Sequence, residues 1–345
     1  MLKKPKKLQQ GDKIALVSPS SGGAGDSDTR WRYEQGVRRL EKEFGLEVVP
    51  MPHSLKGTDY LYEHPEARAE DLMTAFQDDQ INGIIANVGG KDCIQLLPYL
   101  DLQVIRDHPK VFMGYSDITI LHLIMAKAGV SSFYGPNVLT DFAENVEMSS
   151  YTTEMVKRIL FSNETIGEIE PAGEWAIEVL EWDEAEKNEP LTMLPNSGYE
   201  LLQGSGIVKG RLIGGCMDVL ETAKGTEIWP EPAVWEDSLL FLEVADGTLD
   251  AGRIKQWLRN YGAQGILQKV HGVIFGKPQN EQVYDDYKKV IRETMKENGL
   301  EHVPVLFNVN FGHTKPKTVL PYGAMAEINC DQKTFSILEN GVESK

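Results

Sequence analysis

The chain of 345 residues exceeds the usual size of a single hydrophobic core, so we expect two domains. Hydrophobic residues make up 41% and charged residues 25%, a composition typical of globular proteins that argues against global disorder. Acidic residues outnumber basic ones by 52 to 35, and the net charge of −17 would repel the phosphates of nucleic acids and of anionic membranes. Neither is an expected partner.

The amino terminus and the cysteines indicate the compartment. Residues 1–7 carry positive charge, but polar residues follow where a secretory signal needs an apolar segment. No run approaches the roughly 20 apolar residues of a membrane-spanning helix. The three cysteines are odd in number and lack a CxxC or Cys/His ligand pattern, which fits a reducing compartment without disulfides or structural zinc. We therefore expect a cytoplasmic protein with no metal or other cofactor.

The first third of the chain alternates short β-branched runs with helical stretches. This alternation is typical of βαβ units, in which helices cover both faces of a parallel sheet. The predicted strands are 13–18, 46–49, 83–88 and 111–113, and the predicted helices are 32–43, 65–78, 94–97 and 118–128.

Glycine-rich turns follow the first and third of these strands. Residues 18–25 are rich in serine and glycine, but they lack the GKS/T ending of a phosphate loop, so we interpret them as a loop that borders the site. Gly89 and Gly90 follow the strand 83–88. Glycines at such a turn let backbone N–H groups approach a ligand closely, as an oxyanion hole requires.

The fourth strand ends in the layout of a nucleophile elbow. Val111-Phe-Met-Gly114 is followed by Tyr115, Ser116 and a helix. A tight strand-to-helix turn lifts a serine hydroxyl clear of the sheet, and the amide of Asp117 after it would supply a second oxyanion donor. Ile118 occupies the place of the second glycine of the α/β-hydrolase pattern. A helix-capping role for Ser116 or Asp117 therefore stays an alternative.

Between residues 164 and 206 the pattern fails, because acidic residues crowd a segment punctuated by prolines. We interpret 166–205 as a linker and surface loop between domains 1–165 and 206–345. The second domain should be mixed α/β. Its predicted strands are 206–210, 238–244, 270–275, 303–309 and 326–329, and its predicted helices are 215–223, 251–261 and 283–298.

A serine nucleophile needs a general base and an orienting carboxylate. Of seven histidines, His313 directly follows the end of a predicted strand, where ligand sites gather in α/β folds. Glu243 interrupts the apolar strand 238–244, where a carboxylate is costly unless it is paired. Two alternatives stay open. Glu243 could be a surface residue of an edge strand, and Asp246 could be the orienting acid in its place.

Together, Gly114-Tyr-Ser-Asp-Ile-Thr119, Val88-Gly-Gly90, Leu242-Glu-Val244 and Gly312-His-Thr314 resemble the LD-carboxypeptidase family of serine peptidases. The resemblance implies a flavodoxin-like parallel-sheet amino-terminal domain, a smaller mixed α/β carboxy-terminal domain and a homodimer. It also implies a Ser116–His313–Glu243 triad, with an oxyanion hole from the amides of Gly90 and Asp117 and no metal.

Two subgroups would fit the resemblance. Murein-recycling members release terminal D-Ala from a tetrapeptide, whereas microcin-immunity-like members cleave a peptidyl-nucleotide. The acidic loop with Trp175 and Trp182 favours the second, since an aromatic ring there can stack on a purine. We therefore expect Gly89 and Trp182 to contact the substrate. A non-catalytic binding protein for a small ligand and an α/β-hydrolase esterase stay alternative readings.

Overall fold

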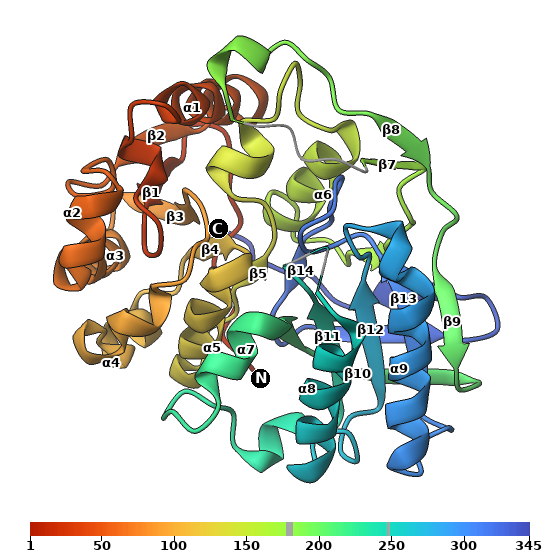
Figure 1. The fold of residues 1–345 in the computed structure, drawn as a ribbon. Coiled ribbons are helices and arrows are strands. Elements are labelled where there is room, and N and C mark those ends of the chain that lie inside the picture. The colour runs from red at the N-terminus through yellow and green to blue at the C-terminus, as the bar shows by residue number, and fades with distance from the viewer. Residues whose placement is uncertain (177–181, 246, 248) are drawn as a thin grey trace.

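The computed structural model describes residues 1–345 except 177–181, 246 and 248. The strands of this described part form a six-stranded, mostly parallel sheet and an eight-stranded mixed sheet, with a separate two-stranded ribbon. Figure 1 shows the two large sheets as neighbouring α/β units, the first built mainly from the amino-terminal half of the chain. Two-domain α/β architecture is thus confirmed.

The six-stranded sheet has the order β14-β5-β4-β3-β1-β2. Strands β1 to β5 are parallel and follow the flavodoxin-like order 2-1-3-4-5, which confirms the predicted topology. The edge strand β14 comes from the carboxy-terminal part and pairs antiparallel with β5. The strands are β1 Lys13–Val17, β2 Glu47–Pro50, β3 Ile81–Ala86, β4 Val111–Gly114, β5 Phe133–Tyr134 and β14 Leu320–Pro321.

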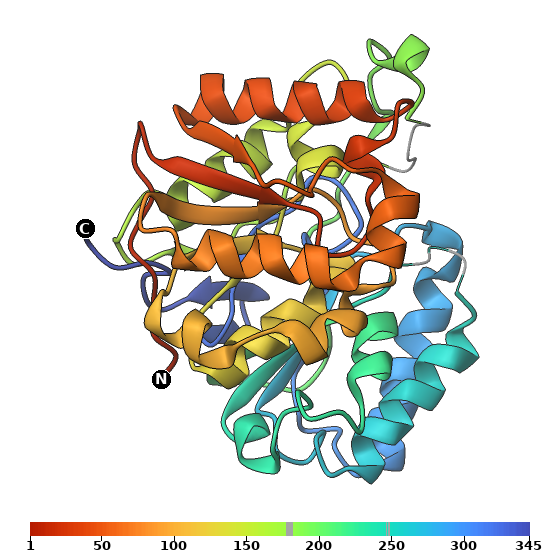
Figure 2. The ribbon, with the colours of Figure 1, turned by 90° about the vertical axis from the view of Figure 1, so that its left-hand side faces the viewer.

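Apolar strands form the centre of this sheet because helices cover both of its faces, as the two views of Figures 1 and 2 show. All four residues of β4 are buried. The predicted helix 94–97 is a 3-10 helical stretch, Cys93–Tyr99, that contains Pro98. The α-helices are α1 Arg30–Phe44, α2 Thr58–Glu63, α3 Pro65–Gln77, α4 Leu102–Asp107, α5 Thr119–Ala128 and α6 Ser150–Leu160.

The eight-stranded sheet has the order β6-β16-β15-β10-β11-β12-β13-β9, with β10 to β13 parallel at its centre. Helices α8 and α9 pack side by side along this sheet (Figure 1). Its elements are β6 Gly167–Glu168, β9 Glu200–Gln203, β10 Ile207–Cys216, α7 Met217–Ala223, β11 Ser238–Glu243, α8 Ala251–Ala263, β12 Gly272–Gly276, α9 Tyr284–Glu297, β13 Val305–Val309, β15 Met325–Asn329 and β16 Thr334–Ile337.

Two expectations about this half of the chain are wrong. The segment between 164 and 206 is not without regular structure: β6 and β9 join the eight-stranded sheet, while β7 Glu174–Ala176 and β8 Met193–Pro195 form the ribbon. These strands have two to four residues, too few for alternation to show in the sequence. The helix expected from residue 215 begins at Met217 instead, because β10 continues through Gly215.

None of the helices in the described part combines the length and apolar character that crossing a bilayer requires. The predicted domain boundaries at 165 and 205 stay predictions.

Candidate active site

Ser116 lies at the sharp turn between β4 and α5. Its backbone φ of 67° is in the left-handed region, which a non-glycine residue adopts only under constraint. Here Tyr115 is still extended, and a 3-10 turn from Ser116 to Ile118 leads directly into the helix. The Thr119 hydroxyl donates to the Ser116 carbonyl at 2.7 Å and supports the turn. This geometry is that of a nucleophile elbow.

His313 bridges Ser116 and Glu243, although 197 and 70 residues of chain separate it from them. Its Nε2 lies 3.0 Å from the Ser116 hydroxyl oxygen, and its Nδ1 lies 2.7 Å from Oε2 of Glu243. An ionised carboxylate only accepts hydrogen bonds, so Nδ1 carries the proton and Nε2 is free to accept the serine proton. The structure therefore brings together the three residues expected to form the triad.

Glu243 is buried in the middle of the eight-stranded sheet, with 2% of its surface exposed. The alternative of an edge-strand surface position is thus wrong, because β11 lies between β10 and β12. Burial raises the pKa of this carboxyl, but the charge and hydrogen bond of His313 and the hydrogen bond from Tyr134 outweigh it, and the net pKa is lowered. Asp246, the rival acid, lies outside the described residues.

Tyr134, at the end of β5, links two members of this group. Its hydroxyl donates to Oε1 of Glu243 and accepts the backbone N–H of Ser116 at 3.3 Å. The side chain is completely buried. Sequence reasoning missed this residue, since a two-residue strand has no periodic pattern and a tyrosine in it resembles ordinary core.

The turn at Gly89 and Gly90 lies against the nucleophile. A Cβ on Gly89 would stand 2.8 Å from Cβ of Ser116, and one on Gly90, whose φ is 151°, would stand 2.4 Å from Oγ of Ser20. The hydrogen bonds found among the described residues leave the amides of Gly90 and Asp117 unused. Asp117 directly follows Ser116 and Gly90 directly follows Gly89, so both amides stay candidates for the oxyanion donors.

The Asp117 side chain organises this edge of the site. Its Oδ2 accepts hydrogen bonds from the Ser20 hydroxyl at 2.5 Å and from the Cys93 amide at 2.8 Å. The buried guanidinium of Arg68 donates to the carbonyls of Pro19 and Asp92 and so ties the same two loops together. The serine- and glycine-rich loop after β1 thus borders the site, as its sequence suggested.

Aromatic packing fixes the His313 ring. Tyr115 meets it edge to face, with ring centroids 4.9 Å apart. The Lys317 ammonium lies 3.6 Å from the centre of the Tyr115 ring and 2.9 Å from a carboxylate oxygen of the buried Asp141. These three residues carried no sequence signal, because their roles depend on neighbours distant in the chain.

The two tryptophans of the acidic segment have different surroundings. Trp175 is buried, and the Lys277 ammonium lies 3.9 Å from its ring centre. Trp182 is only partly buried, with its ring over the guanidinium of Arg32 at 5.1 Å. Arg32 in turn lies 3.9 Å from Glu144, which pairs with Lys315, two residues after His313.

His122 illustrates why the other histidines are poor candidates for the base. It is fully buried in α5, next to Ser132 at Nδ1 and the Gly114 carbonyl at Nε2. Burial lowers its pKa from 6.5 to about 4, so the ring stays neutral at physiological pH. Its role is to support the strand that carries the elbow.

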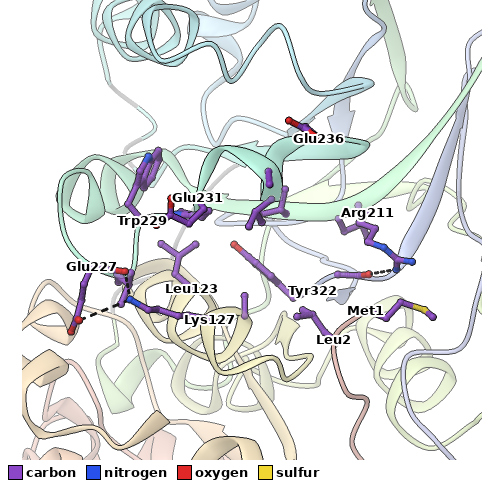
Figure 3. A pocket seen from close by; sticks show the side chains of 18 residues that line it. Met1, Leu2, Leu123, Lys127, Arg211, Glu227, Trp229, Glu231, Glu236 and Tyr322 are labelled. Carbon is purple, nitrogen blue, oxygen red and sulfur yellow. Dashed lines mark hydrogen bonds and ion pairs between the residues drawn. The ribbon is translucent and has the colours of Figure 1, made fainter. Parts of the chain in front are cut away.

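A pocket of about 480 Å³ is lined by residues of α5, of the middle of β10 and of the segment 227–236. Figure 3 shows Leu123, Lys127, Arg211, Trp229 and Tyr322 around it. Residues 211–213 of β10 line the pocket, whereas Cys216, which ends this strand beside Glu243, does not. The pocket is therefore distinct from the candidate active site.

Residues 14–135 match the LD-carboxypeptidase N-terminal domain and residues 209–328 match the LD-carboxypeptidase C-terminal domain. Among curated proteins, the chain is 28% identical to the microcin C7 self-immunity protein MccF of Escherichia coli, and the match covers 96% of this chain and 94% of MccF. It is 29% identical to the "Probable murein peptide carboxypeptidase" of Bacillus subtilis, over 98% of this chain and 95% of that protein.

Among solved structures, an MccF-like protein from Streptococcus pneumoniae in complex with AMP superposes with a TM-score of 0.87. It is 32% identical, and the match covers 95% of this chain and 99% of that chain. The similarity therefore extends over both halves of the molecule.

Proposed function

The chain belongs to the LD-carboxypeptidase family of serine peptidases, and we propose that it hydrolyses an amide near the carboxyl end of a peptide or peptidyl-nucleotide through Ser116, His313 and Glu243. One observation carries the proposal: His313 lies within hydrogen-bond distance of both the strained Ser116 and the buried Glu243. A binding protein would have no use for this alignment.

In the proposed reaction, the Ser116 hydroxyl attacks the scissile carbonyl while Nε2 of His313 takes its proton. Glu243 holds the Nδ1 proton and stabilises the imidazolium. The free amides of Gly90 and Asp117 bind the oxyanion of the tetrahedral intermediate. His313 then gives its proton to the leaving amine, and a water molecule, activated by the same base, releases the acyl group from Ser116. This sequence requires neither a metal nor another cofactor.

For the substrate, we favour the microcin-immunity-like subgroup. The similar structure from Streptococcus pneumoniae holds AMP, and Trp182 presents a partly exposed indole on the segment that packs over Arg32. An indole there offers a stacking surface for a purine, and Gly89 lets the scissile group approach Ser116. The murein tetrapeptide reaction is the second candidate, because overall identity to the murein peptide carboxypeptidase is as high as that to MccF.

The decisive experiment compares two amides as substrates of the wild type and of Ser116→Ala. One is a murein tetrapeptide ending in D-Ala, and the other is a peptidyl-aspartyl adenylate analogue with a non-hydrolysable phosphate mimic. Cleavage of either by the wild type alone supports the triad and identifies the subgroup. Equal cleavage by Ser116→Ala refutes the nucleophile, and cleavage of neither by folded wild type favours a binding protein.

A homodimer is part of the proposal and rests on the family resemblance. Sedimentation velocity at several concentrations tests it: a monomer throughout the range would refute it.

A further inference from the structure

The central strands of the eight-stranded sheet place a thiol beside the proposed triad. Cys216 ends β10 and is in register with Glu243, which ends the neighbouring parallel strand β11. One donor atom from each of Cys216, Glu243 and His313 lies within 4.8 Å of the other two. The thiol has no role in acyl transfer, so its position next to the base and its carboxylate calls for a separate explanation.

We propose that Cys216, Glu243 and His313 form an inhibitory site for a thiophilic divalent cation such as Zn²⁺. Thiolate, carboxylate and imidazole are the ligand types that Zn²⁺ takes from proteins. Tetrahedral Zn²⁺, with bonds of about 2.0 to 2.3 Å, holds its donors about 3.3 to 3.7 Å apart. Side-chain movements of about 1 Å would therefore bring the three donors onto one ion.

The surroundings of Cys216 favour a cation. The thiol lies 3.6 Å from Oδ2 of Asp218, which is suitably placed to orient it. Burial, and then the negative charges of Glu243 and Asp218, raise the pKa of Cys216, so without metal the thiol stays protonated. Zn²⁺ offsets these negative charges. Its binding converts Cys–SH and Zn²⁺ into Cys–S–Zn⁺ and releases one proton to solvent.

The ion would stop catalysis by occupying the base. Ligation through Nδ1 of His313, the nitrogen that faces Glu243, replaces the hydrogen bond between these two residues. The proton of the neutral ring then lies on Nε2, which can no longer accept the proton of the Ser116 hydroxyl. The His313 side chain is 15% exposed, so this donor is accessible to an ion from solvent, whereas Glu243 and Cys216 are buried behind it. Only the inhibitory consequence rests on the proposed function; the metal site itself does not.

Metal binding can be tested without turnover. Ser116→Ala protein is titrated with Co²⁺, and we expect a thiolate-to-cobalt charge-transfer band that saturates at one ion per chain. The band should vanish when Cys216→Ala is added to Ser116→Ala. It should persist when Cys330→Ala, which removes another buried thiol, is added instead. No band, or a band that survives the loss of Cys216, overturns the proposal.

Inhibition is tested with whichever substrate the wild type cleaves. We expect Zn²⁺ to inhibit, EDTA to restore activity, and Cys216→Ala to turn over at the wild-type rate while requiring at least about 10-fold more Zn²⁺. Equal Zn²⁺ sensitivity of both proteins overturns the proposal. If the wild type cleaves no substrate, the proposed function fails, and the cobalt titration still decides the metal site.

Discussion

The phenolic hydroxyl of Tyr134 donates a hydrogen bond to the buried carboxylate of Glu243. The same oxygen accepts the backbone N–H of Ser116, so one side chain from β5 fixes the positions of both the acid and the elbow. Hydrogen bonds to buried carboxylates are among the stronger ones, because the charge is poorly solvated.

Tyr134→Phe should therefore lower kcat by about 10-fold or more while leaving KM nearly unchanged, since a hydrogen bond to a charged group contributes about 1.5 to 3 kcal/mol. Steady-state kinetics on the cleaved substrate measures this. Tyr322→Phe is the matched control, because among the described residues the hydrogen bonds of that buried hydroxyl are with the backbone of Gly214. Equal losses in both variants would mean that Tyr134 acts only through stability.

Glu243→Gln should reduce kcat about 10⁴-fold, less than the roughly 10⁶-fold loss expected for Ser116→Ala. The amide can present its NH₂ group to His313 and favour the wrong tautomer, but the nucleophile and the oxyanion donors remain. Single-turnover rates of the two variants decide the order. An exposed glutamate, as in Glu236→Gln, serves as a control. A larger loss for Glu243→Gln than for Ser116→Ala would contradict a purely orienting role.

Gly312→Ala should impair activity by displacing the orienting carboxylate. A Cβ at this position would stand 2.6 Å from Cγ and 2.7 Å from Oε2 of Glu243, and the backbone φ is 91°. Gly299→Ala is the control that distinguishes backbone strain from a collision with a neighbouring side chain. Its φ is 70°, but its Cβ would meet nothing within 4 Å. Both variants should lose about 1 kcal/mol of stability from backbone strain. Only Gly312→Ala should lose turnover, and wild-type kcat in that variant would refute the collision.

His122 should make the protein less stable in mild acid. Its folded pKa is about 4, below the ordinary value of 6.5, so the unfolded chain binds more protons between these values. The stability that His122 contributes is complete above about pH 6.5 and is lost as pH falls towards 4, by about 3 kcal/mol.

Urea unfolding at pH 7 and pH 4.5 measures this dependence. His122→Gln cannot titrate, so its free energy of unfolding should fall less between the two pH values than that of the wild type. His302→Gln, a change at an exposed position, should keep the wild-type dependence. An unchanged dependence in His122→Gln would show that another group controls the acid response.

Local patterns in the sequence determined the elements of the first domain and the elbow. The short apolar runs of β1, β3 and β4 and the apolar face of α5 depend on neighbouring residues only, so the βαβ units and the turn at Ser116 were predictable. The flavodoxin-like fold was implied by the family resemblance. The positions of His313 and Glu243 at strand ends were visible for the same reason. The strands β5, β6 and β9 were missed because none of them forms an apolar run that stands out from its surroundings.

The tertiary structure alone decided which of these side chains meet. The sequence left Glu243 undecided between a surface and a buried position, and only the order β10-β11-β12 buries it. That order also sets Cys216 beside Glu243, and the pairing of β5 with β4 brings Tyr134 to Ser116. Strand neighbours are chosen by packing across the whole molecule, and no local pattern of residues records that choice.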